Sequence, residues 1–219
     1  ICKMEKENNI VYVSAGEGTT SQGDFHEALN WASNAKAPVI FHIQDNEYAI
    51  STHRSEQMAG SVYTMTSGYK NLARYNVDGT NFFESNLAFK EAIERARKKK
   101  GPSVIVSNVV RLLPHSSSDD QRKYRTEKSL KIDREKDPIQ ILENQCLEKN
   151  IVDQKEFKKI KEILEIQINN DAEWAEEQIF PDPNTALDHI YSNNKILVEP
   201  KFEPISDKIV IVDAINHAL

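Results

Sequence analysis

The chain has 219 residues, enough for one sizeable α/β domain or for a domain with an extension, and its net charge is −6 with no basic stripe of the kind that marks a nucleic-acid-binding protein. No apolar stretch approaches the roughly 18 to 20 residues needed to cross a bilayer. Because Cys2 and Cys146 lie far apart and form no metal or redox motif, we expect a reducing compartment and therefore a cytoplasmic protein. The charge pattern and the lack of a long apolar stretch predict neither nucleic acid nor membrane as a partner.

The first half of the chain predicts strands and helices in alternation. Residues 9–15 predict a buried strand, Asp24 can cap a following helix, and residues 39–43 predict a second buried strand. A strand–helix–strand unit implies a parallel sheet with a right-handed crossover. We expect a long irregular segment over residues 46–68 and a short strand at residues 75–77. A helix over residues 82–100 and a further strand over residues 103–111 should follow.

The second half is polar and helical. Asp137 and Pro138 make a good helix start, Asp153 opens a second long helix that runs to about residue 178, and a short helix is expected near residues 185–191. The composition predicts four parts. These are an α/β core (1–135), a helical extension (136–191), a linker (192–206) and the start of a further region (207–219).

A carboxylate between two glycines is the most informative feature of the chain. Gly16-Glu17-Gly18 follows the first predicted strand, where glycines usually let the backbone approach a phosphate. Glu17 would repel a phosphate unless a cation such as Mg²⁺ lies between them, and Asn46 at the end of the next strand offers a second oxygen ligand. The alternative is a plain turn between a strand and a helix. On the residues alone, a divalent-metal and diphosphate site is one of two interpretations.

Longer motifs resemble one family. The segments "GEGTTSQGDFHEALNWA", "APVIFHIQDNEYAIST" and "HSSSDDQRKYR" are similar to the alpha subunits of thiamine-diphosphate-dependent 2-oxo acid dehydrogenases. The resemblance covers about residues 10–190. It implies a parallel-sheet, three-layer α/β/α thiamine-diphosphate-binding fold with a C-terminal helical extension. It also implies oxidative decarboxylation of a 2-oxo acid, with transfer of the acyl group to a lipoyl group on a partner acyltransferase.

The resemblance also implies roles for particular residues. Glu17 and Asn46 would bind Mg²⁺ through their side chains and Tyr48 through its backbone carbonyl. Around the diphosphate we expect three residues, Gly16, Gly18 and Gln44. Three positions depart from the usual pattern of the family: Asp45 and Glu47 stand where Asn and Gly are usual, and Pro114 stands where branched-chain members often have histidine.

The polar loop after the last predicted strand holds the expected catalytic residue, His115. A lone loop histidine is usually solvated, but in the family the matching histidine lies beside the cofactor and serves proton transfer. Ser116 stands at a position that mitochondrial relatives phosphorylate, where a phosphate would keep the loop from closing. Charged side chains that could order the loop are Arg111, Asp119, Asp120, Arg122 and Arg125.

Two further likenesses concern the substrate and the assembly. Ser118-Asp119-Asp120 and "STHRSEQMAG" favour branched-chain 2-oxo acids of the 3-methyl-2-oxobutanoate type, with pyruvate or acetoin as the alternative substrate. The tail "ISDKIVIVDAINHAL" resembles the start of a beta subunit, so we expect a fragment of an alpha–beta fusion within an alpha2beta2-type assembly. The fragment alone should be inactive. A non-catalytic interaction module is the alternative from another functional class.

Overall fold

A four-stranded parallel sheet is the core of the first half of the chain in a computed structural model that describes residues 8–191 and 210–218. The strands lie in the order β1-β2-β6-β5, and every neighbouring pair is parallel. This confirms the parallel sheet and the strand–helix–strand unit expected from the sequence. The strand bounds are β1 (Val11–Gly16), β2 (Val39–Asp45), β5 (Ala73–Asp78) and β6 (Ser103–Asn108).

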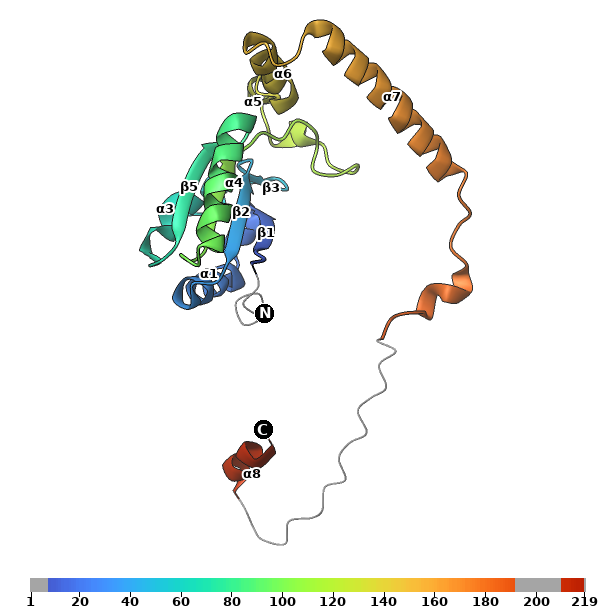
Figure 1. Cartoon of the computed structure of the whole chain (residues 1–219). Helices are drawn as coiled ribbons and strands as arrows, with labels where there is room; N and C mark the ends of the chain where they lie inside the picture. The colour runs from blue at the N-terminus through green and yellow to red at the C-terminus, as the bar shows by residue number, and fades with distance from the viewer. Residues whose placement is uncertain (1–7, 192–209, 219) are drawn as a thin grey trace. The chain divides into compact units, whose positions relative to one another are not determined.

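Helices cover both faces of this sheet, as Figure 1 shows. On one face, α1 (Gly23–Ala35) and α3 (Val62–Met65) pack against β2 and β6 through Leu29 and Val62, which are fully buried. On the other face, α4 (Phe82–Arg97) packs Ala88 and Ala92 against Ile40 and Ile105. The α/β fold with helices on both sides of the sheet is therefore confirmed.

Strand β1 is an edge strand, and the prediction that it is buried is wrong. The side chains of Val11, Tyr12 and Val13 are 40%, 53% and 42% exposed. An apolar run is compatible with a strand covered on both faces, but burial also needs a neighbour on each side, and β1 pairs only with β2 in the described sheet.

The segment predicted to be irregular has short elements. A two-stranded hairpin pairs Tyr48 with His53 in β3 (Tyr48–Ala49) and β4 (Thr52–His53). It is followed directly by α2 (Arg54–Gln57), then by α3 and the 3₁₀ helix η2 (Thr66–Gly68). These elements are too short to produce a hydrophobic period, which is the signal that the prediction used.

After β6 the chain forms a loop and two helices with side-chain caps. The loop contains η3 (Gln121–Lys123), and Thr126 caps α5 (Glu127–Arg134) by accepting the amide of Ser129. Asp137 accepts the amide of Ile139 at the start of α6 (Pro138–Glu148). The helix start expected at Asp137 and Pro138 is confirmed.

Contacts divide the chain into two compact units, Ile1–Ile163 and Leu164–Leu219. Helix α7 (Gln154–Glu176) crosses the division, and the second unit also contains η4 (Pro183–Leu187) and α8 (Ile211–Ala218). The linker expected over residues 192–206 lies outside the described residues, and the four parts drawn from the composition stay predictions. Among the helices that the structure describes, none has the length and apolar character required for a membrane span.

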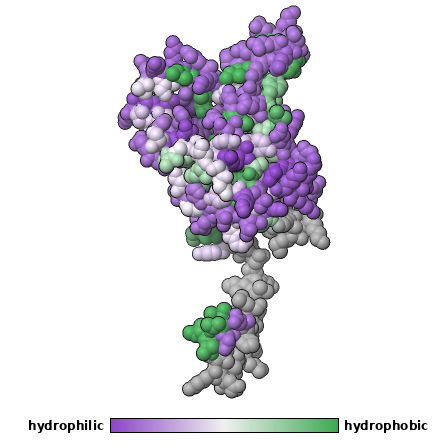
Figure 2. All heavy atoms as spheres, turned by 90° about the vertical axis from the view of Figure 1, so that its left-hand side faces the viewer, coloured by the Kyte–Doolittle hydropathy of each residue, from purple (hydrophilic) through white to green (hydrophobic). Residues whose placement is uncertain are grey.

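Helix α8 and the residue before it, Val210, expose apolar side chains. Val210, Ile211, Val212 and Ile215 are all more than half exposed, and the apolar patch of this segment is green in Figure 2. The amphipathic helix expected at the end of the chain is therefore present over the described residues.

Candidate functional site

The predicted site residues lie at the carboxyl ends of the parallel strands. Gly16 at the end of β1 pairs with Gln44 in β2, and Asp45 at the end of β2 pairs with Asn108 in β6. This edge is where open parallel sheets bind ligands. The register therefore brings the Gly16–Gly18 turn beside residues 44–48, although about 29 positions separate them in the sequence.

Glu17 has a buried carboxylate with one unpartnered oxygen. The residue begins the 3₁₀ helix η1 (Glu17–Ser21) and is 1% exposed. Its Oε2 accepts the backbone amide of Asn46 at 3.3 Å, whereas its Oε1 has no hydrogen-bond partner among the described residues. An orphaned carboxylate oxygen in such a place is energetically costly and suits a bound cation.

The surroundings of Glu17 oppose its ionisation. Burial raises the pKa of the Glu17 carboxyl above its ordinary value, and the nearby Asp45 carboxylate raises the same pKa further. The amides of Glu17 and Asn46 and the Arg54 guanidinium act in the opposite direction. The pKa is raised overall because the ionised Glu17 carboxylate has too few partners, and a bound cation would provide the missing partner.

The two glycines beside Glu17 have different environments. A Cβ added at Gly18 would lie 2.7 Å from Cβ of Ala49, so the turn packs closely against the β3–β4 hairpin there. A Cβ at Gly16 would meet nothing within 4 Å. Gly18 is thus needed for packing, and Gly16 leaves open space above the strand end.

Gly18→Ala should therefore destabilise the full-length protein by about 1 to 3 kcal/mol, because the added methyl group overpacks the contact with Ala49. The matched control is Gly16→Ala, which should be neutral or slightly stabilising since the φ of Gly16 is −81°. Urea unfolding of both variants measures the difference. Equal stability of the two would show that the hairpin yields to the extra methyl group.

Asn46 organises the turn that follows β2. Its Oδ1 accepts the backbone amide of Tyr48 at 3.0 Å, and its own backbone amide donates to Glu17. An amide oxygen has two lone pairs, so Oδ1 can still take a cation as a ligand. Asn46 and Tyr48 are both partly buried, which places a side-chain oxygen and a backbone carbonyl in the same turn.

The loop after β6 is tied back to the β3–β4 hairpin. Arg111 donates to the carbonyl of Ile50 and to the hydroxyl of Tyr124, both at 2.7 Å, and the ring of Tyr124 lies 5.9 Å from that of Tyr48. The Tyr124 hydroxyl donates to Asp119 Oδ2 at 2.6 Å and lowers the pKa of the Asp119 carboxyl, as does the amide of His115. The loop that carries His115 thus adjoins the turn that carries Asn46.

Arg125 is the buried centre of this loop. It is 6% exposed and donates to the carbonyl of Arg111, to Gln121, to Ser129 and to Asp133. Its guanidinium also lies 4.9 Å from the centre of the Tyr48 ring. The carboxylate partner of Arg125 is therefore Asp133 of α5, and the sequence did not predict that pair.

The remaining charged residues of the loop are at the surface. Asp120 pairs with Arg122 at 2.8 Å, with both side chains exposed. His115 is exposed. Among the described residues, the Ser116 hydroxyl forms a hydrogen bond with the hydroxyl of Ser118. Of the charges predicted to order the loop, Arg111 and Arg125 join it to other elements. Asp119 bonds within the loop to Tyr124 and His115, and Asp120 and Arg122 pair with each other.

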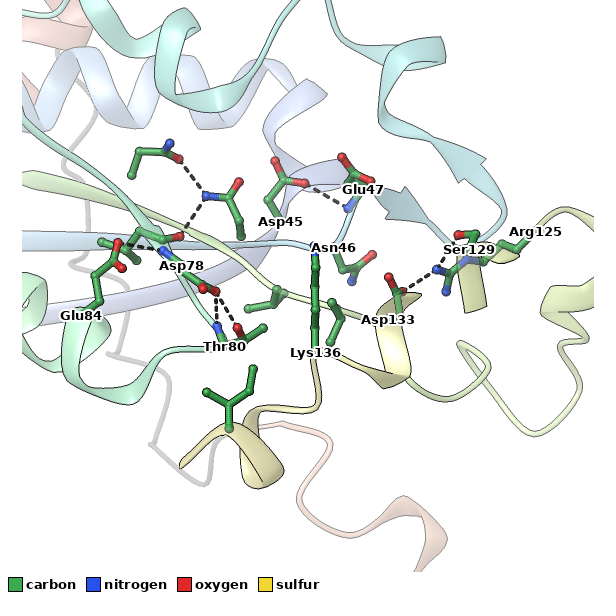
Figure 3. A pocket seen from close by; sticks show the side chains of 16 residues that line it. Asp45, Asn46, Glu47, Asp78, Thr80, Glu84, Arg125, Ser129, Asp133 and Lys136 are labelled. Carbon is green, nitrogen blue, oxygen red and sulfur yellow. Dashed lines mark hydrogen bonds and ion pairs between the residues drawn. The ribbon is translucent and has the colours of Figure 1, made fainter. Parts of the chain in front are cut away.

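A cavity of about 570 Å³ opens at the same sheet edge. Figure 3 shows side chains that line it, among them Asp45, Asn46, Glu47, Asp133 and Lys136. Carboxylates outnumber cations in its lining. The turn with Asn46 thus borders an open, polar hollow.

The described residues contain no group of three or more His, Cys, Asp or Glu side chains that could hold a metal ion. A cation here would have to combine the single carboxylate of Glu17 with the amide oxygen of Asn46, a backbone carbonyl and oxygens of a ligand. Mg²⁺ is commonly bound in that way, through one or two carboxylates and the phosphates of a substrate. The donor set and the orphaned oxygen of Glu17 fit such an ion.

The family described as "Dehydrogenase E1 component" matches residues 1–184. The chain is 36% identical over 192 residues to the 2-oxoisovalerate dehydrogenase subunit alpha of Bacillus subtilis, an alignment that covers 87% of the chain and 58% of that relative. It is 33% identical to the pyruvate dehydrogenase E1 component subunit alpha of Acholeplasma laidlawii, an alignment that covers 77% of the chain and 49% of that relative. It is 37% identical to the corresponding subunit of Staphylococcus aureus, with 66% of the chain and 40% of that relative covered. The chain thus spans about half the length of these curated relatives.

Proposed function

The chain belongs to the dehydrogenase E1 component family, and from this premise we propose that it is part of the alpha subunit of a thiamine-diphosphate-dependent 2-oxo acid dehydrogenase. The observation that carries the proposal is the unpartnered Oε1 of Glu17, buried at the carboxyl end of a parallel strand and next to Asn46. A buried carboxylate without a partner is what a diphosphate-bound cation requires and what a plain turn does not need.

Mg²⁺ and thiamine diphosphate are the groups that these residues would hold. Glu17 and Asn46 would supply side-chain oxygens to the ion and Tyr48 its backbone carbonyl, and oxygens of the diphosphate would supply the remaining ligands. The open space at Gly16 and the neighbouring end of β2 at Gln44 leave room for the diphosphate. When bound, thiamine diphosphate supplies the nucleophilic carbon and the electron sink for decarboxylation of a 2-oxo acid.

The loop after β6 supplies the proton carrier in this proposal. An imidazole can both accept and donate a proton, and His115 lies in the loop that Arg111 and Tyr124 tie to the β3–β4 hairpin. Asp119 holds the backbone of His115 by accepting its amide. The exposed imidazole would then be available to a substrate at the edge of the site.

The substrate we propose is a branched-chain 2-oxo acid, which makes the whole enzyme a 3-methyl-2-oxobutanoate dehydrogenase (2-methylpropanoyl-transferring). Support comes from Ser118-Asp119-Asp120, from the segment at residues 51–60, and from the similarity to a 2-oxoisovalerate dehydrogenase subunit. Pyruvate is the second candidate, because relatives of comparable identity are subunits of pyruvate dehydrogenases. Acetoin stays a third.

The partners we propose are a beta subunit and a lipoyl-bearing acyltransferase. The likeness of the tail at residues 205–219 to the start of a beta subunit supports a beta-like region in the same chain, and the assembly would be of the alpha2beta2 type in the cytoplasm. An interaction module without catalysis is the rival proposal. Asp45 and Glu47 favour it, because they add negative charge beside a site for a diphosphate.

Oxidation of 2-oxo acids by the full-length protein tests this proposal. With Mg²⁺ and thiamine diphosphate present, 3-methyl-2-oxobutanoate should drive reduction of an electron-accepting dye faster than pyruvate does. The reverse preference would keep the reaction and overturn the substrate. Dye reduction with neither acid, nor with acetoin, would favour the interaction module.

A further inference from the structure

The turn that carries Asn46 has a carboxylate on each side. Asp45 has a side chain that is 1% exposed, and Glu47 has one that is 55% exposed. A diphosphate approaching Asn46 would meet both negative charges at short range, where the interaction is strong because Asp45 is shielded from water. The proposed site therefore needs a positive charge of its own in addition to the metal.

Arg54 supplies that charge. Its Nη1 forms an ion pair with Asp45 Oδ2, and its Nη2 donates to Glu47 Oε1 at 3.1 Å. Its backbone amide donates to the carbonyl of Glu47 at 2.8 Å. We call this set of three residues, Asp45, Glu47 and Arg54, the counter-ion clamp.

The clamp also fixes the backbone around Asn46. Asp45 Oδ1 accepts the amide of Glu47 at 3.0 Å, so both oxygens of the Asp45 carboxylate are in use. Figure 3 shows Asp45 and Glu47 side by side at the edge of the cavity, joined by this bond. Glu47 has a φ of 69°, a conformation that a residue with a side chain adopts only where its surroundings impose it.

Arg54 reaches the turn because the hairpin is short. The β3–β4 hairpin reverses the chain within a few residues, and α2 begins directly after it at Arg54. His53 Nε2 lies 3.9 Å from Glu47 Oε2, which puts a second nitrogen near the more exposed carboxylate. Among the described residues, the ion pairs of Asp45 and Glu47 are formed only with Arg54 and His53.

We propose that Arg54 is a positioning residue for the metal and diphosphate: its positive charge offsets part of the negative charge of Asp45 and Glu47, and it holds the turn so that Asn46 and the Tyr48 carbonyl can face the ion. The inference rests on the proposed function and extends it to a residue outside the predicted set. In this proposal Arg54 acts through the turn, by its bonds to Asp45 and Glu47.

The test measures binding of thiamine diphosphate to the full-length protein by calorimetry at saturating Mg²⁺. Arg54→Gln should weaken binding by about 10- to 100-fold, the loss typical of residues that orient metal ligands. Asp45→Asn combined with Arg54→Gln removes both charges of the buried pair, and it should restore most of the lost affinity because the new side-chain amide oxygen can still accept the amide of Glu47. Arg122→Gln, which breaks an exposed pair elsewhere, should bind as the wild type does.

Three outcomes would overturn the inference while the wild type binds the cofactor: unchanged binding by Arg54→Gln, failure of the double variant to recover, or an equal loss in Arg122→Gln. The double variant also covers the case in which Arg54→Gln alone fails to fold. Absence of binding by the wild type would instead overturn the proposed function, and with it the premise of the clamp.

Discussion

Glu17→Gln is expected to stabilise the full-length protein when no cofactor is bound, by about 1 kcal/mol or more, because an unsatisfied neutral amide costs less to bury than an unsatisfied carboxylate. The side chain is 1% exposed and its Oε1 has no partner among the described residues. The same change should weaken Mg²⁺-dependent binding of thiamine diphosphate by at least about 100-fold, the upper end of what loss of a supporting residue causes. The opposite signs separate a metal ligand from a structural carboxylate.

The pH dependence of the free energy of unfolding should also differ between the wild type and Glu17→Gln. Burial raises the pKa of Glu17 above its ordinary value of 4.5. A group whose folded pKa is raised contributes stability that is fully present below the ordinary pKa and is lost as the pH rises through the folded pKa. Between those two values, the wild type should lose stability relative to Glu17→Gln, as thermal unfolding at a series of pH values would show.

The control is Glu27→Gln, which changes an exposed carboxylate on α1. It should alter neither stability nor binding by a measurable amount, since surface charges contribute little. A less stable Glu17→Gln protein that still binds the cofactor normally would contradict the assignment of Glu17 to the metal.

The second large effect should come from Arg125→Met. The Arg125 side chain is 2% exposed and its partner Asp133 is 18% exposed, so the substitution leaves a largely buried carboxylate without its cation. Breaking one partner of such a pair costs about 3 to 5 kcal/mol. Because Arg125 also joins the loop to the carbonyl of Arg111 and to Ser129, hydrogen exchange across residues 111–134 should rise.

Arg122→Met is the matched control, three positions away in the same loop. Its side chain is 79% exposed and its pair with Asp120 is open to solvent. The substitution should therefore lower the free energy of unfolding by no more than about 1 kcal/mol. Urea unfolding of the two variants compares them directly. Similar stability of both would show that the buried network around Arg125 does not hold the loop.

The sheet could be predicted because three of its strands, β1, β2 and β6, contain apolar runs, and helices of regular period separate the strands. β2 and β6 are buried on both faces, and their sequences show it. β1 has the same kind of sequence but lies at an edge, and nothing within a strand specifies how many neighbours it has. The β3–β4 hairpin was missed because strands of two residues have no period to detect.

The candidate site was predicted in part for a similar reason. Glu17 and Asn46 carry a local signal, since each follows a strand and strand ends of a parallel sheet meet at one edge. Arg54 and Asp133 carry none. Their partners depend on how a hairpin and a helix fold back onto the sheet edge, which no spacing in the sequence expresses. The unusual Asp45 and Glu47 were the available clue, because two unexplained negative charges require a nearby cation.

Calorimetric titration of the full-length protein with thiamine diphosphate, once with Mg²⁺ and once with a chelator, tests the central claim most directly. If Glu17, Asn46 and the Tyr48 carbonyl hold the metal that anchors the diphosphate, saturable binding will occur with Mg²⁺ and disappear without it. Binding of equal strength in the chelator, or no binding under either condition, would contradict the assignment of this sheet edge to a metal–diphosphate site.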